Sequence, residues 1–276
     1  MNNLNKFGLP AGFAGGDDNA FLRQGSVYQV PTDFVELPSG GRFYPPGSSL
    51  HGKEKLEIKY MTAREEDLLV SPALLKEGLA LDRVIESLLV DKTIKSKELL
   101  SGDKTAILIN ARKNAYGDSY KFPFICTSCA KESAGEILLS QVKNKQIEED
   151  EFCKISDRST VLIRLPKTGV TVELKMLTSE DEAIIQKAIE KRTSNNLPAE
   201  ALLTRYRQMI LSINGNDNIE LIVSFINSMP IMDSNFLKKK YSNILPDVEF
   251  KYNCNCEHCS AENGGTAPIL ANFFWP

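Results

Sequence analysis

The stretch KYNCNCEHCS, Lys251 to Ser260, places three cysteines and a histidine close together in the chain. It contains one C-x-x-C pair, Cys256 and Cys259, which supplies half of the ligands of a tetrahedral metal site. A second pair with the same spacing, Cys126 and Cys129, occurs upstream in ICTSC. The two pairs form a candidate four-cysteine site if the fold brings them to one place.

The amino-acid composition is typical of a folded protein, and the net charge does not indicate a charged ligand. The chain has 276 residues, 42 % of them hydrophobic and 25 % charged, with a formal net charge of −3. This charge offers no basic surface to phosphate backbones, and no apolar run reaches the about 18 residues of a membrane span. We therefore expect no nucleic-acid binding and no membrane span. The N-terminal residues lack a secretory signal pattern, so we expect reduced cysteines, and paired thiols favour a metal site.

The second half of the sequence restates the first. LEIKYMTAREEDLL (56–69) matches VELKMLTSEDEAII (172–185), and the 28-residue segment 102–129 aligns without a gap with 232–259. A weaker match joins VELPSGG (35–41) to IRLPKTG (163–169). Identity is low, but the order of elements recurs, which indicates an internal duplication.

Local signals give each repeat the same elements. Thr62 with Glu65, and Thr178 with Asp181, are capping signals that start a helix after a strand. Asp103 and Asp233 occupy equivalent positions and are interpreted as N-caps of the last helix of each repeat. Apolar residues at helical spacing predict one further helix in each repeat: Leu81, Val84, Ile85, Leu88 and Leu89, and then Leu202, Tyr206, Met209, Ile210 and Ile213.

The predicted fold is α+β, with two tandem pseudo-equivalent repeats, each made of a strand, helices, a strand and a CxxC knuckle. A shared zinc-ribbon-like site of four cysteines joins them. The predicted segments are a flexible N-terminal arm (1–33), repeat 1 (34–142), a charged linker (143–157), and repeat 2 with an aromatic C-terminal tail (158–276).

Four cysteines in two aligned pairs predict one structural Zn²⁺ held by Cys126, Cys129, Cys256 and Cys259. Cys254 aligns with Phe124 and is interpreted as a buried apolar thiol, although Cys254 or His258 remains an alternative ligand. Cys153 has no partner in sequence. Metal-free core thiols are the main alternative, whereas a redox site is disfavoured because both pairs follow strands.

No phosphate-binding loop, nucleophile elbow or H-E-x-x-H motif is present, and the sequence contains only two histidines. We therefore expect no catalytic residues and no enzyme. The tail ILANFFWP carries Phe273, Phe274 and Trp275, which we expect either to pack into the chain's own core or to anchor a partner.

Several stretches together resemble the baseplate hub or hub-assembly proteins of T-even-type contractile-tailed bacteriophages. They are LPSGGRFYP, YMTAREEDLL, LLSGDKTAILINARKNAYG, ICTSC and FFWP, and the similarity covers Val35 to Pro276. The resemblance implies a non-enzymatic structural or assembly role through contacts with other baseplate hub and tail proteins. It also implies a location in the virion tail baseplate, or in the host cytoplasm during assembly. Two alternatives stay open: a zinc-ribbon nucleic-acid-binding protein and a tail-associated envelope hydrolase.

Overall fold

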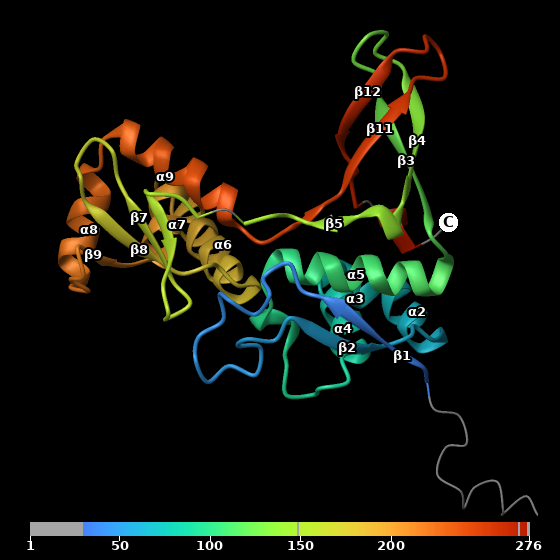
Figure 1. The fold of residues 1–276 in the computed structure, drawn as a ribbon, viewed down its shortest axis with the longest axis horizontal. Coiled ribbons are helices and arrows are strands. Elements are labelled where there is room, and N and C mark those ends of the chain that lie inside the picture. Colours follow the sequence, from blue (N-terminus) through green and yellow to red (C-terminus); the bar gives the residue numbers. More distant parts are fainter. Residues whose placement is uncertain (1–29, 148, 270, 275–276) are drawn as a thin grey trace, which may run out of the picture. The chain divides into compact units, whose positions relative to one another are not determined.

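The computed structural model describes residues 30–147, 149–269 and 271–274, and all the elements below lie between Thr32 and Phe274 (Figure 1). Most of the predicted N-terminal arm lies outside the described residues. Thr32 and Asp33, the last two residues of that segment, belong to the first strand. The fold combines helices with antiparallel strands, as the sequence predicts.

The first half begins with a two-stranded antiparallel sheet, in which Val35 of one strand lies opposite Leu56 of the other. Helices follow, and the half ends in a hairpin. The elements are β1 (Thr32–Glu36), β2 (Lys55–Lys59), α2 (Ala63–Val70), α3 (Pro72–Glu77), α4 (Ala80–Leu88), η1 (Ser96–Glu98), α5 (Ser101–Tyr116), β3 (Ser119–Ile125), β4 (Glu132–Leu138) and η2 (Leu139–Gln141).

The second half contains a four-stranded antiparallel sheet in the order β6-β7-β8-β9, and it also ends in a hairpin. The elements are β5 (Lys143–Asn144), β6 (Cys153–Ile155), β7 (Val161–Arg164), β8 (Thr171–Leu174), α6 (Ser179–Ser194), α7 (Ala201–Met209), β9 (Ile210–Ile213), α8 (Ile219–Ser228), α9 (Ile231–Ile244), β10 (Val248–Glu249), β11 (Lys251–Asn255), β12 (Glu262–Thr266) and η3 (Ala271–Phe274). Strands β5 and β6 both lie in the segment 143–157, so this sheet begins inside the predicted linker.

The two hairpins, β3–β4 and β11–β12, lie side by side (Figure 1). Strand β11 faces β4, where the Cys254 sulfur lies 3.7 Å from the Glu136 carbonyl oxygen. Aromatic rings also join the hairpins, because Phe122 packs edge-on against Tyr252 at 4.9 Å between centroids. The hairpins therefore bring their turns, which carry the two C-x-x-C pairs, to the same end.

Both predicted capping boxes are confirmed. The Thr62 hydroxyl caps the start of α2, and a Glu65 carboxylate oxygen accepts the Thr62 N–H at 2.8 Å. In α6, the Thr178 hydroxyl accepts the Asp181 N–H at 3.3 Å, and Asp181 accepts the Thr178 N–H at 3.1 Å. Each box satisfies two backbone donors that the first helical turn leaves without intrahelical partners.

Replacing either threonine by alanine is expected to lower the free energy of unfolding by about 1 kcal/mol, because one helix-start N–H loses its acceptor. Urea denaturation of Thr62→Ala and Thr178→Ala measures this loss. Thr193→Ala is the matched control, since its hydroxyl only donates to the Ile189 carbonyl within the exposed end of α6. A loss as large in the control as in the two capping variants would contradict the assignment.

Asp103 and Asp233 are not N-caps, so that prediction is wrong. The N-cap positions of α5 and α9 are Leu100 and Pro230, and each aspartate lies one turn further along, fully buried. Both carboxylates instead accept backbone N–H groups from the preceding Leu-Pro turn. Asp103 accepts the Ser39 N–H at 3.0 Å, and Asp233 accepts the N–H groups of Lys167 and Thr168, at 2.8 and 3.0 Å.

The second helical stripe is only partly helical. Tyr206 and Met209 are buried on α7 as predicted, but Ile210 and Ile213 form β9 and complete the four-stranded sheet. The run ILSI is a short, mostly apolar stretch of strand length, and periodicity alone does not distinguish such a stretch from part of a helix. In the first half, Leu89 follows α4 and makes a single antiparallel bridge to β2 at the corresponding place.

Phe273 and Phe274 pack into the chain's own core, where they are 1 % and 2 % exposed. The Arg112 side chain donates from Nε to the Phe273 carbonyl oxygen at 2.6 Å, and Phe273 lies edge-on to Tyr120. For these two rings the structure agrees with the first of the two expectations, packing into the chain's own core. Trp275 lies outside the described residues.

The helices of the described part of the chain are either too short or too polar to cross a bilayer.

Candidate metal centre

Each cysteine pair lies in a turn of the same construction. In the first hairpin, the Cys126 N–H donates to the Lys131 carbonyl oxygen at 2.9 Å, and the Ala130 N–H donates back to the Cys126 carbonyl oxygen at 3.0 Å. In the second, the corresponding bonds join Cys256 to Ala261 and Ser260, each at 2.9 Å. The backbone φ angles of Ala130 and Ser260 are 56° and 57°, a left-handed conformation that lets each chain reverse within the turn.

The turns direct backbone donors at sulfur. The Ser128 N–H donates to the Cys126 sulfur and the His258 N–H to the Cys256 sulfur, both at 3.4 Å. Donors in this arrangement stabilise a thiolate, which is the form of cysteine that binds metal.

The side chain of Asn263, which belongs to no recognisable sequence motif, connects the two turns by hydrogen bonds. Asn263 of β12 is 4 % exposed, and its amide nitrogen donates to the Cys126 sulfur of the other hairpin at 3.4 Å. Its amide oxygen accepts the Thr127 N–H at 2.9 Å. The only sequence signal for this role is a polar residue within a glycine-rich strand, which is too common to be informative.

The structure brings Cys126, Cys129, Cys256 and Cys259 together, with all four sulfur atoms within 4.8 Å of one another. Across the hairpins, the Cys126 sulfur is 3.6 Å from that of Cys259, and the Cys129 sulfur is 3.7 Å from that of Cys256. A tetrahedral ion with Zn–S bonds of about 2.3 Å places its sulfur ligands about 3.8 Å apart. Both distances exceed the about 2.05 Å of a disulfide bond. The donor set therefore fits a closed four-thiolate site for an ion such as Zn²⁺.

The backbone around the sulfurs shifts their pKa values unequally. N–H donors from Cys129 and then Ser128 lower the pKa of Cys126 to about 6. The His258 N–H, followed by the Cys259 N–H, lowers the pKa of Cys256. The Ala261 N–H also acts to lower the pKa of Cys259, but desolvation and the three neighbouring cysteines outweigh it and raise this pKa to about 12. At neutral pH the quartet is thus partly deprotonated before any metal enters.

Metal uptake is expected to release more protons at low pH than at high pH. Because metal binds thiolates, uptake at pH 7 displaces at least the Cys259 proton, and uptake below the Cys126 pKa of about 6 displaces that proton as well. The apparent Zn²⁺ affinity therefore decreases with falling pH, and more steeply below pH 6. Calorimetric titration in two buffers with different ionisation enthalpies counts the protons. A count that stays the same between pH 5 and pH 8 would contradict this assignment.

The remaining candidates lie outside the quartet. Cys254 is half-buried, not buried as expected, and its sulfur faces the Glu136 carbonyl oxygen. The His258 ring points away, with Nε2 3.0 Å from the Glu132 carbonyl oxygen. Cys153 is buried in β6, where desolvation raises its pKa to about 11 and keeps it a thiol.

The family model described as T4 bacteriophage base plate protein matches residues 31–275. Neither the curated proteins nor the solved structures include a match to this chain. The match spans both halves, including the four cysteines and the buried residues Phe273 and Phe274. The chain therefore belongs to the T4 bacteriophage base plate protein family, which implies a structural place in the tail baseplate among other phage tail proteins.

Proposed function

We propose that the protein is a non-enzymatic component or assembly factor of the hub of a contractile-tail baseplate, and that a single structural Zn²⁺ holds its two hairpins together. The observation that carries the proposal is the gathering of four cysteine sulfurs from two distant segments in a protein of the baseplate family. A closed site of this kind stabilises a fold and has no open position for a substrate. A closed metal site of this kind suits a protein that must keep its shape within an assembly.

In this proposal, the chain's own residues do most of the positioning. Each turn presents its sulfurs with backbone N–H donors already in place, and Asn263 fixes the second hairpin against the first. The bound ion supplies a cross-link between the hairpins. The edge-on contact of Phe122 with Tyr252 adds an apolar contact between the same two hairpins.

We further propose that the two halves are tandem copies of one unit, and matching contacts in the two halves support this. Glu65 and Asp181, each third in its helix, also accept a side-chain donor from a later helix of the same half: Ser87 of α4 at 2.6 Å and Gln208 of α7 at 2.6 Å. The buried Asp103 and Asp233 hold equivalent Leu-Pro turns. The segments 34–142 and 158–276 would then be the two copies, joined through 143–157.

The partners of the carboxylates that a hydrolase would need favour a non-enzymatic function. Asp181 is occupied by Lys175 at 2.7 Å and by the capping box, and Glu65 by its own box and Ser87. Asp103 and Asp233 are fully buried against backbone donors. These groups have structural partners and no access to a substrate.

Metal analysis of the natively purified full-length protein tests the zinc proposal, with an expected content of one Zn²⁺ per chain. A folded protein without zinc, or one ion in each half separately, would overturn the shared site. Mass spectrometry of purified virions beside infected-cell lysate then distinguishes a resident hub component from an assembly factor. Steeply salt-dependent DNA or RNA binding, or degradation of host cell wall by the purified protein, would instead support one of the two alternative functions.

A further inference from the structure

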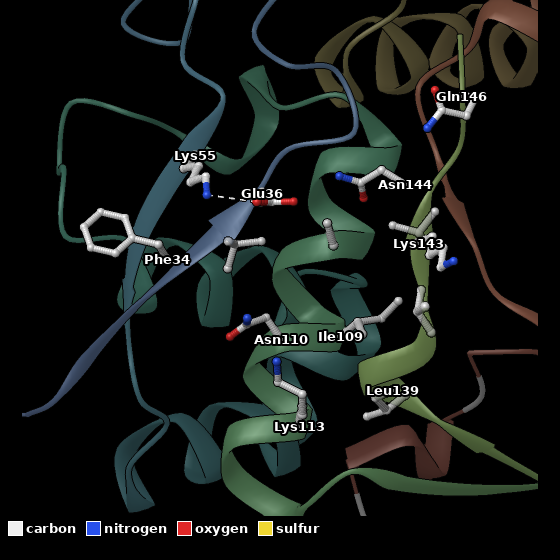
Figure 2. Close-up of a pocket in the computed structure, with 14 residues that line it drawn as sticks. Phe34, Glu36, Lys55, Ile109, Asn110, Lys113, Leu139, Lys143, Asn144 and Gln146 are labelled. Atoms are coloured by element: carbon white, nitrogen blue, oxygen red, sulfur yellow. Dashed lines mark ion pairs between the residues drawn. The ribbon is translucent and has the colours of Figure 1, made fainter.

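A groove of about 530 Å³ lies over α5, between β1 on one side and β5 on the other (Figure 2). Its floor is formed by one face of the helix, and its walls by consecutive residues of the two strands. The residues that matter for its chemistry are Ile109, Asn110 and Lys113 on the floor, Phe34 and Glu36 on one wall, and Lys143 and Asn144 on the other.

Strand β1 turns an unpaired edge to this groove. The Leu37 N–H donates to the Glu54 carbonyl oxygen, and in antiparallel pairs the residues that bond across the ladder alternate. Val35 therefore bonds toward β2, whereas Phe34 and Glu36 direct their backbone groups to the opposite, open side. The Phe34 N–H is already satisfied by the Asp33 carboxylate at 2.8 Å, so the Glu36 N–H and the carbonyl groups remain available there.

Strand β5 is open in the same way. The Lys145 N–H donates to the Asp247 carbonyl oxygen at 2.8 Å, so Lys145 and Lys143 bond toward β10. Asn144, between them, directs its backbone N–H and carbonyl groups away from β10. Asn144 also lines the groove.

The two short sheets flank a single helix, α5 (Figure 2). One added strand would need walls about twice 4.8 Å apart to pair with both edges. Each sheet has only two strands, an arrangement that is marginally stable without further pairing or packing. Insertion of one strand would turn the pair of two-stranded sheets into a single five-stranded sheet over α5.

The charge of the groove indicates which kind of segment can bind there. Its lining contains three lysines and one acid, Glu36, whose carboxylate already pairs with Lys55 at 2.9 Å. Lys113 and Lys143 make no ion pair within the described part of the chain. The floor also contains the apolar residues Ala106 and Ile109, which are 7 % and 6 % exposed. The complementary segment is extended, acidic, and apolar at alternate positions.

We propose that this groove binds an extended acidic segment of another protein chain, which adds as a β-strand between β1 and β5. Main-chain hydrogen bonds to Glu36 and Asn144 supply affinity, and acidic side chains reach Lys113 and Lys143. This inference concerns a surface that contains none of the four cysteines and does not depend on a bound metal.

A labelled seven-residue peptide of alternating valine and acidic residues, added to the full-length protein, tests the proposal by fluorescence anisotropy. Binding is expected, and the double variant Lys113→Glu/Lys143→Glu is expected to bind the peptide at least about tenfold more weakly. Lys187→Glu is the control for charge, since Lys187 is exposed on α6 and its replacement makes the same charge change as each of the two single substitutions, but outside the groove. It is expected to leave the affinity unchanged.

The backbone contribution is tested with the same peptide methylated at alternate amide nitrogens, on either of its two edges. Both methylated forms are expected to lose binding, because a strand between two edges needs donors on both sides. Hydrogen exchange of the Glu36 and Asn144 amides is expected to slow when the unmodified peptide binds. No binding up to about 1 mM, equal binding of a lysine-for-acid peptide, equal weakening by Lys187→Glu, or unchanged exchange at both amides would overturn the proposal.

Discussion

The double variant Cys126→Ser/Cys256→Ser is expected to lose its zinc and several kcal/mol of its free energy of unfolding. Structural Zn²⁺ sites contribute about 10–16 kcal/mol of apparent binding free energy, which is comparable with the whole stability of a typical domain. Both cysteines are almost fully buried, at 1 % and 2 % exposure, and each accepts an N–H donor that a serine oxygen would meet at a different distance. Metal analysis and thermal unfolding of the purified variant measure the two effects.

Cys254→Ser is the matched control for this variant, because Cys254 lies two residues from Cys256 but outside the quartet. It is expected to keep one Zn²⁺ and to change the free energy of unfolding by less than about 1 kcal/mol. A chelator should lower the melting temperature of the wild-type protein and of Cys254→Ser, but not that of the double variant. Zinc loss from Cys254→Ser combined with retention in Cys256→Ser would show that the ligand set is different.

Replacing Asp103 or Asp233 by alanine is expected to cost about 3 kcal/mol at each site. Each carboxylate is fully buried and accepts at least one backbone N–H from a Leu-Pro turn, and Asp103 also accepts the Tyr44 hydroxyl at 2.5 Å. Removing the acceptor leaves those donors buried without a partner, at about 1–3 kcal/mol each. Urea denaturation measures the loss.

Asp118→Ala provides the control, because Asp118 also accepts a serine N–H and the hydroxyl of the same serine, Ser140, at 2.7 and 2.6 Å. Those bonds lie at the surface, where water replaces the lost acceptor. A loss below about 1 kcal/mol is expected. Equal losses at positions 118, 103 and 233 would mean that burial of the turn does not determine the cost.

The features that could be predicted from the sequence are those that depend on residues only a few positions apart. The capping boxes depend on residues three apart, such as Thr62 and Glu65, so their spacing alone carries the information. The cysteine pairs are equally local, and their meeting followed from the alignment of the two halves. Asp103 shows the limit: its neighbours suggest an N-cap, but its actual partner, Ser39, lies 64 positions away.

Strands β12 and β9 could not be predicted from the sequence, for two different physical reasons. The sequence of β12, ENGGT, has two glycines and no β-branched residue before its end, and it becomes a strand because the turn at Cys256–Cys259 folds it back on β11. Ile210 continues a helical spacing but pairs with Leu174 of β8 instead. The groove between β1 and β5 has no local signature, because its lining comes from five separate stretches of the chain.

The separation of the two cysteine pairs along the sequence also means that they are synthesised at different times. Cys129 and Cys256 are 127 positions apart, and a ribosome that adds about 5–20 residues per second takes on the order of 10 s to cover that distance. During this interval the first turn has left the ribosome with two reactive thiols, but the second cysteine pair has not yet been synthesised. A second nascent chain on the same message carries the same cysteine pairs, so we expect exchange of hairpins between neighbouring copies to compete with closure within one chain when expression is high.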